Sequence, residues 1–375
     1  MQLPERLRQK LQDREEKGIR RQLKHTVAAL DFCSNDYLGL ARSPALKQAM
    51  LLELQRQAGL PLGATGSRLL SGNYPLMEAL EDKLAAYHQA EAALLFNSGY
   101  AANTGFFSCI PQRGDTIFYD EASHASIKDG IRLSFAKAYA FRHNAPDDLR
   151  SKFKHATGQV YVAVESLYSM DGDFAPLAEL AAICREQGAC LVVDEAHTTG
   201  LSGARGAGLV QELGLTDRVF ARIMTFGKAL GSHGAIVAGG RELKDYLVNF
   251  SRPFIYTTAL PLHTVIHLDC AYRLLPGLDA ERARVKQLSG YFRQSFPQLI
   301  PAGTNTAGSP IQAVRIPDIG RLKTAAQNLQ AAGFEVRPVF SPTVPVGKEQ
   351  LRVILHAFNT EAEITALGHI IAKSL

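Results

Sequence analysis

The 375-residue chain has 46% hydrophobic and 21% charged residues, which is typical of a globular protein with a core large enough for more than one domain. Its net charge of +5 is spread along the chain without a sustained basic run, which argues against nucleic acid as a partner and suits small anionic ligands. No run approaches the roughly 18 apolar residues of a membrane span, and the first residues lack the apolar stretch of a secretory signal. We therefore expect a cytoplasmic protein with no membrane partner, whose five scattered cysteines stay reduced.

The first predicted element is an amphipathic arm helix at residues 4–24, whose apolar stripe must pack on something outside the helix. From residue 44 to residue 244, stretches with helical periodicity alternate with short apolar runs. This alternation predicts a mostly parallel sheet covered by helices. The runs expected to be strands are residues 92–96, 116–119, 159–164, 190–193, 219–224 and 235–238.

The remaining elements predict a second, smaller domain. Residues 253–295 have a helical pattern with breaks near Pro261 and Pro276. Strand, helix, strand and helix are then expected at residues 311–316, 320–332, 351–355 and 360–374. The whole pattern predicts an α/β protein with an N-terminal arm of helix and strand at 1–43, a large domain at 44–275 and a smaller α+β domain at 276–375.

Residues suited to catalysis follow two of the predicted strands. Asp194 and His197 come after residues 190–193, at the carboxyl end, where open α/β sheets build their ligand sites. Lys228 lies after the next strand, in a loop of small residues. A cofactor held as a Schiff base, such as pyridoxal 5′-phosphate (PLP), needs a confined amine, a carboxylate that keeps its pyridine nitrogen protonated, and a phosphate anchor. These residues can supply the amine and the carboxylate.

The turn at Ser98, Gly99 and Tyr100 can supply the phosphate anchor. It follows residues 92–96 and opens a helix, whose free backbone N–H groups and dipole favour a phosphate. Each feature also occurs alone in proteins without a cofactor, because a Gly-Lys turn and a serine N-cap are common. The combination of the three features predicts a PLP site.

Short motifs occur in a fixed order along nearly the whole chain. They are Ser34-Asn35-Asp36-Tyr37-Leu38-Gly39-Leu40, Gly66-Ser67-Arg68-Leu69-Leu70-Ser71-Gly72-Asn73-Tyr74, Asn97-Ser98-Gly99-Tyr100-Ala101-Ala102-Asn103, Ser123-His124-Ala125-Ser126, Ser169-Met170-Asp171-Gly172-Asp173, Asp194-Glu195-Ala196-His197, Thr225-Phe226-Gly227-Lys228, Tyr256-Thr257-Thr258-Ala259-Leu260-Pro261, and Pro342-Thr343-Val344-Pro345 followed by Leu351-Arg352. With these motifs the sequence resembles the α-oxoamine synthases, PLP enzymes that join an amino acid to an acyl-CoA with loss of CO2. The resemblance implies PLP-dependent transferase fold type I, in which a large domain carries a mostly parallel seven-stranded sheet and a smaller domain follows.

The resemblance also implies roles for residues around the cofactor ring. Lys228 is expected to form the Schiff base, Asp194 to pair with the pyridine nitrogen, and His124 to stack on the ring. His197 and Ser169 are expected near the ring hydroxyl. Lys228, His124, Asp194 and His197 are thus the expected catalytic residues, and Lys228 and His124 are the expected proton carriers.

A second set of residues is implied at the cofactor phosphate. Ser98 and the amides of Gly99 and Tyr100, together with Thr225, resemble the phosphate site of this family. Thr258 in such enzymes reaches the phosphate of the neighbouring subunit. The resemblance therefore implies a homodimer with its active site at the subunit interface.

The expected substrates are an amino acid and an acyl-CoA. Arg352 matches the arginine that holds the amino-acid carboxylate, and a planar guanidinium suits a carboxylate well. Asn35 is a second expected substrate contact. Arg20 and Arg21 are candidates for a distal carboxylate of the acyl group, although arginines on the exposed face of an arm helix are common.

The tract at residues 32–40 and the compact length are most similar to the branch of the family that condenses L-alanine with pimeloyl-CoA in biotin synthesis. Branches that use glycine or serine share the cofactor residues and stay open as alternatives. Ser166, Thr198 and His233 depart from the family pattern, which bears on substrate specificity and leaves the Schiff-base chemistry untouched.

Other classes of function are less well supported. A non-catalytic partner subunit would lack the lysine that stands here as Lys228, and another fold type I reaction would not need His124. His263 and His267 are four residues apart on a predicted helix, but the HExxH pattern is absent and packing explains them, so no metal is expected.

Overall fold

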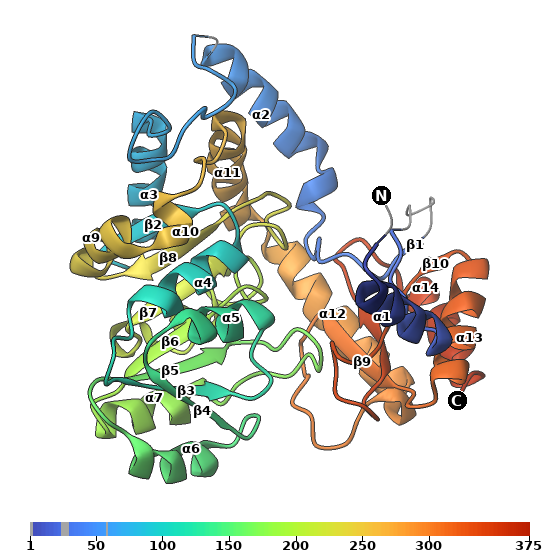
Figure 1. Cartoon of the computed structure of the whole chain (residues 1–375). Helices are drawn as coiled ribbons and strands as arrows, with labels where there is room; N and C mark the ends of the chain where they lie inside the picture. The colour runs from blue at the N-terminus through green and yellow to red at the C-terminus, as the bar shows by residue number, and fades with distance from the viewer. Residues whose placement is uncertain (1–2, 24–29, 58) are drawn as a thin grey trace.

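The structure of the chain is a computed structural model that describes residues 3–23, 30–57 and 59–375. Residues 1–2, 24–29 and 58 lie outside the described residues, so part of the predicted N-terminal arm is not covered. Figure 1 shows a large body built on one sheet, a smaller body with its own strands, and the long helix α12 (Asp279–Ser295) beside the smaller body.

The large body is built on a seven-stranded sheet with the order β2-β8-β7-β6-β5-β3-β4. Its strands are β2 (Ala92–Phe96), β3 (Thr116–Asp120), β4 (Lys137–Phe141), β5 (Val160–Glu165), β6 (Cys190–Asp194), β7 (Ala221–Thr225) and β8 (Ala235–Gly239). All neighbouring pairs are parallel except those of β8, which is antiparallel to both β2 and β7. The predicted mostly parallel sheet is confirmed. The prediction missed β4, an edge strand that is exposed along much of its length and therefore lacks a continuous apolar run.

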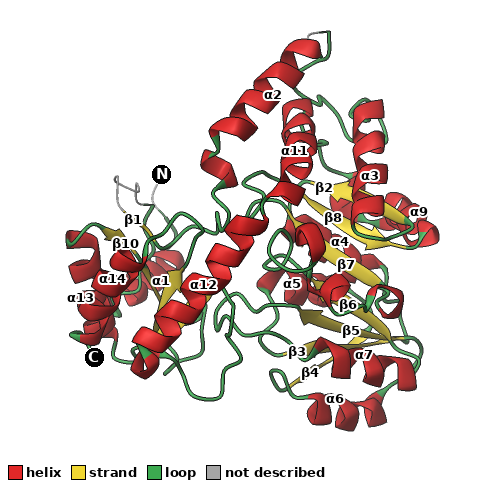
Figure 2. Cartoon of the chain, turned by 180° about the vertical axis from the view of Figure 1, so that it is seen from behind, coloured by secondary structure: helices red, strands yellow, loops and turns green. Residues whose placement is uncertain are grey.

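Helices cover both faces of this sheet, as Figure 2 shows from behind. They are α3 (Pro75–Tyr87), α4 (Gly99–Cys109), α5 (Ala125–Leu133), α6 (Pro146–Lys152), α7 (Leu177–Glu186), α8 (Leu209–Glu212), α9 (Arg241–Phe250), α10 (Arg252–Ile255) and α11 (Leu262–Leu274). Along β5, alternate side chains enter different apolar cores: Tyr161 and Ala163 pack on the side of α4, whereas Val162 and Val164 pack on the side of α7. Both faces of a covered sheet must be apolar, which explains the continuous apolar runs in the sequence.

The smaller body contains the antiparallel sheet β11-β12-β9 and three helices, α12, α13 (Ile319–Ala331) and α14 (Glu361–Ala372), around a separate apolar core. Its strands are β9 (Ile311–Arg315), β11 (Arg337–Val339) and β12 (Gln350–Ile354). The short strand β1 (Leu30–Asp31) pairs in parallel with β10 (Phe334–Glu335). The N-terminal arm thus joins the C-terminal part, although the domain boundaries at 43 and 275 stay predictions.

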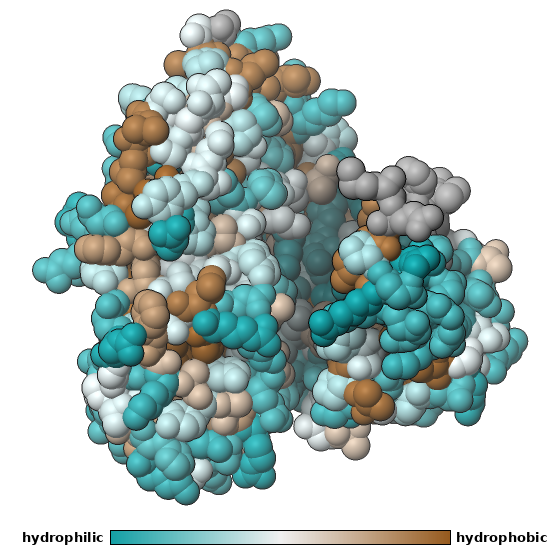
Figure 3. All heavy atoms as spheres, viewed as in Figure 1, coloured by the Kyte–Doolittle hydropathy of each residue, from teal (hydrophilic) through white to brown (hydrophobic). Residues whose placement is uncertain are grey.

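The arm helix α1 (Glu5–Glu16) is shorter than predicted. It ends before Gly18, whose φ of 62° lies in the left-handed region that terminates helices. Leu7 and Leu11 of its apolar stripe are partly exposed, and none of the residues of α1 is buried. The helix α2 (Pro44–Arg56) packs on α11 and projects from the large body. Figure 3 shows apolar side chains, coloured brown, on the surface of α2, and a hollow between the large and the smaller body.

Among the described residues, no helix has both the length and the apolar character needed to cross a membrane. All five cysteines carry free thiols.

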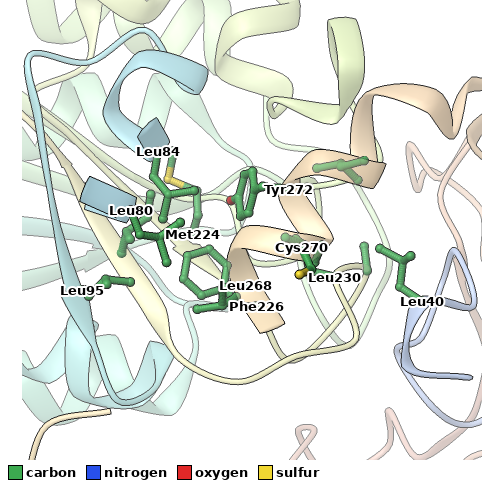
Figure 4. Close-up of a cluster of buried hydrophobic side chains, with 14 of the residues drawn as sticks. Leu40, Leu80, Leu84, Leu95, Met224, Phe226, Leu230, Leu268, Cys270 and Tyr272 are labelled. Carbon is green, nitrogen blue, oxygen red and sulfur yellow. The ribbon is translucent and has the colours of Figure 1, made fainter. Parts of the chain in front are cut away.

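The loop that carries Lys228 rests on a buried apolar cluster (Figure 4). Phe226 and Leu230 flank the lysine and are fully buried among side chains of β7 and α11. Gly231 closes the loop at a φ of 59°, and a Cβ atom there would lie 2.2 Å from the backbone nitrogen of Ala41. The lysine loop and the segment after β1 therefore touch backbone to backbone, which only glycine permits.

We expect Gly231→Ala to destabilise the protein by about 2 kcal/mol or more, because a left-handed backbone and a steric clash each cost energy. The measurement is the free energy of urea unfolding. Gly290→Ala is the matched control, since Gly290 lies within α12 and a Cβ atom there would meet nothing within 4 Å. Alanine at this position should stabilise the helix by roughly 0.5–1 kcal/mol. Equal stability of the two variants would contradict the argument.

Candidate active site

A cavity of about 250 Å3 lies at the carboxyl ends of the strands of the large sheet. Ligand sites of open α/β sheets form at this edge because the loops after neighbouring parallel strands meet there. Among the residues predicted for the site, those lining the cavity are Asn35, Ser98, Gly99, Tyr100, His124, Asp194, His197, Thr225 and Lys228.

Asp194 is the buried carboxylate at the end of β6. Its Oδ1 accepts a hydrogen bond of 2.8 Å from the Ala196 backbone N–H, and its Oδ2 accepts one of 2.7 Å from Asn103 Nδ2. These bonds hold the carboxylate in one orientation while each oxygen keeps a second lone pair. Such a carboxylate can face a protonated ring nitrogen.

Lys228 lies in the loop after β7, next to two acidic side chains. Burial lowers the pKa of its amine, and the positive charge of Arg352 adds to this, while Asp194 and Glu165 act in the opposite direction. The net lowering favours the neutral amine, which is the nucleophilic form and the form that accepts a proton.

His124 begins α5 and is tied to Asp194 through two polar side chains. Its Nδ1 accepts a hydrogen bond of 3.2 Å from the Ser126 backbone N–H and lies 2.7 Å from Ser126 Oγ. Asn103 Nδ2, which donates to Asp194, is also 3.0 Å from Ser126 Oγ. Burial lowers the pKa of His124. The neutral ring therefore carries its proton on Nε2, because a backbone N–H can only donate to Nδ1.

Glu165, at the end of β5, is a buried acid that the sequence analysis missed. The parallel register places it opposite Asp194, and its Oε1 accepts a hydrogen bond of 2.6 Å from the His124 backbone N–H. Burial, followed by the negative charge of Asp194, raises the pKa of Glu165 to about 8. The sequence did contain a signal, since an acid directly after an apolar strand is the pattern that singled out Asp194.

The cradle for a phosphate is formed where α4 begins next to β7. Ser98 caps the helix by accepting a hydrogen bond of 3.1 Å from the Ala101 N–H. A Cβ atom at Gly99 would lie 2.3 Å from Thr225 Cγ2, so glycine is needed for this close approach. Thr225 Oγ1 is buried and has no hydrogen-bond partner among the described residues. An unsatisfied hydroxyl beside a helix N-terminus fits a phosphate group, so the residues present fit PLP.

Arg352, on β12, does not line the cavity itself, but two hydrogen bonds fix it next to Asn35, which does. Its Nε donates to the Ser169 carbonyl at 2.6 Å, and its Nη2 donates to Asn35 Oδ1 at 3.1 Å. Ser169 thus meets the site through its backbone, and its side chain does not line the cavity. Thr258 is exposed outside the cavity, and its carbonyl accepts a hydrogen bond from Asn97 Nδ2.

The two arginines of the arm are not brought to the cavity. Arg20 pairs with Glu15 at 2.9 Å, and both side chains are largely exposed. Arg21 donates to Thr343 Oγ1 at 2.9 Å. Neither side chain lines the cavity, so nothing in this geometry assigns them a substrate.

The three departures from the family pattern lie close to the site. Ser166 and Thr198 are both buried, and their hydroxyl groups are 2.7 Å apart, which links the ends of β5 and β6. His233 is exposed and lines the cavity after the lysine loop. The hydroxyl groups of Ser166 and Thr198 therefore hydrogen-bond to each other beside His197. His233 instead adds an imidazole to the wall of the cavity.

The raised pKa of Glu165 predicts a pH dependence of stability in the protein without cofactor. A carboxyl whose pKa is raised on folding contributes stability below its unfolded value, and this is lost as the pH rises towards about 8. We expect Glu165→Gln, which keeps an acceptor for the His124 N–H, to unfold in urea with a midpoint that varies less with pH over this window. Glu186→Gln, at an exposed carboxylate, is the control. An unchanged pH profile in Glu165→Gln would show that Glu165 is ionised throughout.

Comparison with known proteins agrees with this geometry. The family model for aminotransferase class I and II matches residues 28–371. The chain is 44% identical to 8-amino-7-oxononanoate synthase of Emericella nidulans, over 98% of this chain and 95% of that protein. It is 42% identical to the enzyme of the same name from Geotalea daltonii, over 90% of this chain and 87% of that protein.

Solved structures show the same fold. Serine palmitoyltransferase of Sphingomonas wittichii superposes with a TM-score of 0.91 at 29% identity, over 100% of this chain and 98% of that chain. The 8-amino-7-oxononanoate synthase of Francisella tularensis superposes with a TM-score of 0.80 at 27% identity, over 92% of this chain and 97% of that chain. The chain therefore belongs to the aminotransferase class I and II family and, within it, to the α-oxoamine synthases, the PLP-dependent acyltransferases of fold type I.

Proposed function

We propose that the protein condenses L-alanine with pimeloyl-CoA to give 8-amino-7-oxononanoate, CoA and CO2. The observation that carries this proposal is that Lys228 and Asp194 line one cavity together with Asn35, to which the fixed Arg352 is hydrogen-bonded. The relatives named 8-amino-7-oxononanoate synthase, at 42–44% identity, support the choice of substrates. The predicted cytoplasmic location stays a prediction.

Lys228 and Asp194 have separate roles in the proposed reaction. When bound, PLP supplies an electron sink for the carbon that loses its proton and later its carboxylate. Lys228, whose lowered pKa favours the neutral amine, is placed to take the α-proton of the amino acid and to return a proton to the product. Asp194 holds the ring nitrogen protonated through its buried negative charge.

Binding of the amino acid is assigned to Arg352. Its Nε bond to Ser169 and its Nη2 bond to Asn35 fix the plane of the guanidinium. Nη1 makes no hydrogen bond to any of the described residues. A fixed planar fork binds a carboxylate at a lower entropic cost than a flexible amine does. His124, with its Nε2 proton, is positioned to stack on the ring and to donate to the incoming thioester carbonyl.

Homodimer formation is part of the proposal. Thr258 and its neighbour Tyr256 are exposed on the large body, where Thr258 reaches nothing in its own cavity. The exposed leucines of α2, such as Leu51 and Leu52, form an apolar surface that suits burial against a second subunit.

The main alternative is another reaction of the same family, with glycine or serine as the amino acid. The likeness to serine palmitoyltransferase supports it, but the identity to that enzyme, 29%, is lower than that to the named 8-amino-7-oxononanoate synthases. A non-catalytic partner subunit is disfavoured, because Lys228, Asp194 and His197 all line the cavity.

The reaction is tested by release of free thiol from the PLP-loaded protein. We expect thiol release to require L-alanine and pimeloyl-CoA together, and to be weaker when glycine or L-serine, or acetyl-, succinyl- or palmitoyl-CoA, replaces either one. Lys228→Ala should abolish turnover. A different preferred pair would move the protein to another branch of the family, and no thiol release from any pair would reject acyl transfer.

Arg352→Lys is expected to raise the KM for the amino acid by roughly tenfold or more, because an ammonium cannot reproduce the planar two-point contact. The KM for the acyl-CoA should change little. Arg315→Lys is the matched control, since Arg315 lies on the neighbouring strand β9 and pairs with Asp171 outside the cavity. An equal rise in both KM values would show that Arg352 supports the site only structurally.

A further inference from the structure

A histidine outside the cavity is held between two buried carboxylates. His143 follows β4, and its Nδ1 lies 2.9 Å from Asp120 Oδ1 while its Nε2 lies 2.9 Å from Asp173 Oδ2. Both acids are buried, and none of the three side chains lines the cavity. An ionised carboxylate can only accept a hydrogen bond, so both ring nitrogens must donate. The ring of His143 is therefore an imidazolium.

The environment of His143 agrees with a permanent positive charge. Burial alone would lower its pKa, but the hydrogen bonds and charges of Asp120 and Asp173 outweigh burial and raise the pKa to about 10. The edge of the ring packs on Tyr168, with 4.4 Å between the ring centroids and 87° between the planes. At neutral pH this cation is a fixed part of the structure.

The two carboxylates belong to different segments of the large body. Asp120 ends β3, whereas Asp173 lies in the loop after β5, at residues 166–176. Asn144 reinforces the connection, because its Nδ2 donates to Asp173 Oδ2 and its backbone N–H donates to Asp120 Oδ2, both at 2.9 Å. The φ of Asn144 is 50°, a strained value that persists only where the surroundings hold it. His143 and Asn144 thus tie the loop to the edge of the sheet.

The loop transmits this restraint over a short distance. The Asp173 carbonyl accepts a hydrogen bond from the Tyr168 N–H, and the Tyr168 carbonyl accepts one from the Gly172 N–H, each at 3.0 Å. Ser169 lies inside this closed turn, so the position of its carbonyl follows that of Asp173. The same carbonyl accepts the 2.6 Å hydrogen bond from Arg352 Nε.

Contacts from the smaller body hold the other side of the loop. Gln350 donates to the Met170 carbonyl, and Arg315 pairs with Asp171. These contacts restrain the loop relative to the body that carries Arg352. The His143 contacts restrain it relative to the sheet whose strand ends carry the cofactor residues. Loss of the imidazolium would therefore leave Arg352 less well oriented towards the cavity.

We propose that His143 is a positioning residue for Arg352. Its imidazolium, held between two carboxylates, fixes the loop after β5, and the Ser169 carbonyl of this loop orients the guanidinium that binds the amino-acid carboxylate. The role of Arg352 in amino-acid binding rests on the proposed function, whereas the fixing of the loop does not depend on it.

A metal ion is the alternative occupant of this cluster. One ligand atom each from His143, Asp171 and Asp173 lies within 4.8 Å of the others, an arrangement that also suits a divalent cation. A metal ion requires an unprotonated ring nitrogen, but both nitrogens of His143 already face carboxylates. Asp171 is paired with Arg315. Ion pairs therefore account for the cluster, and EDTA treatment separates the two explanations.

The charge and the loop are tested in PLP-loaded protein without any amino acid. Nitrogen-15 spectra of histidine-labelled protein at pH 8, with His143 assigned through His143→Gln, should show both ring nitrogens protonated. Amide hydrogen exchange in the loop after β5 should be faster in His143→Gln than in the wild type. The matched control is His155→Gln, at an exposed histidine that stacks on Tyr139, and exchange in the loop should stay unchanged there.

The effect on binding is measured as the Kd for L-alanine, glycine and L-serine, from the change in absorbance of the bound cofactor. His143→Gln should raise the Kd of the amino acids that bind by roughly fivefold to tenfold, because a misplaced guanidinium loses part of its contact with the carboxylate. The Kd for PLP should stay at its wild-type value, whereas general damage to the fold would weaken both. In an Arg352→Lys background, His143→Gln should raise the Kd no further, since lysine lacks the Nε–H that Ser169 holds.

Four results would overturn the inference. They are a neutral His143 in the wild type at pH 8, unchanged loop exchange in His143→Gln, an equal loss of PLP and amino-acid binding, and a wild-type Kd that rises after EDTA treatment. The first and the last need no variant to fold. If the wild-type protein bound none of the three amino acids, the proposed function would fail, whereas the exchange rates would still decide whether His143 fixes the loop.

Discussion

The site depends on two buried carboxylates placed side by side. The parallel register of β5 and β6 sets Glu165 opposite Asp194, and neither side chain is open to water. Two negative charges at this spacing repel one another in a medium that screens them poorly. Burial and the charge of Asp194 raise the pKa of Glu165 to about 8, and Glu165 Oε1 accepts a hydrogen bond from the His124 backbone N–H.

The neighbouring groups are arranged around this pair. Lys228 faces both acids, which partly offset the effect of burial on its pKa. Asn103 donates to Asp194 and lies within hydrogen-bond reach of Ser126, which also contacts His124, so one network holds His124 and the Asp194 carboxylate. In such a network the position of each proton follows from the partners available, and fully satisfied networks specify a single arrangement.

The smaller body contacts the loop after β5 through its sheet. Arg352 and Gln350 on β12 each donate to a backbone carbonyl of the loop after β5, at Ser169 and Met170. Arg315 on β9 pairs with Asp171 of the same loop. Polar contacts from the smaller body therefore hold the loop after β5 of the large body.

The sequence by itself determined the fold class, the strands that carry Asp194 and Lys228, and the helix that begins at Gly99, because apolar runs, helix caps and strand ends are local patterns. The sequence analysis missed Glu165, although this acid directly follows residues 159–164 just as Asp194 follows residues 190–193. It also missed the edge strand β4, because a half-exposed strand lacks a continuous apolar run. Only the tertiary structure decided that Tyr37 meets His197, 160 residues away, and that Arg352 meets Asn35, 317 residues away. Such contacts follow from strand order and from the packing of the two bodies, which no local pattern encodes.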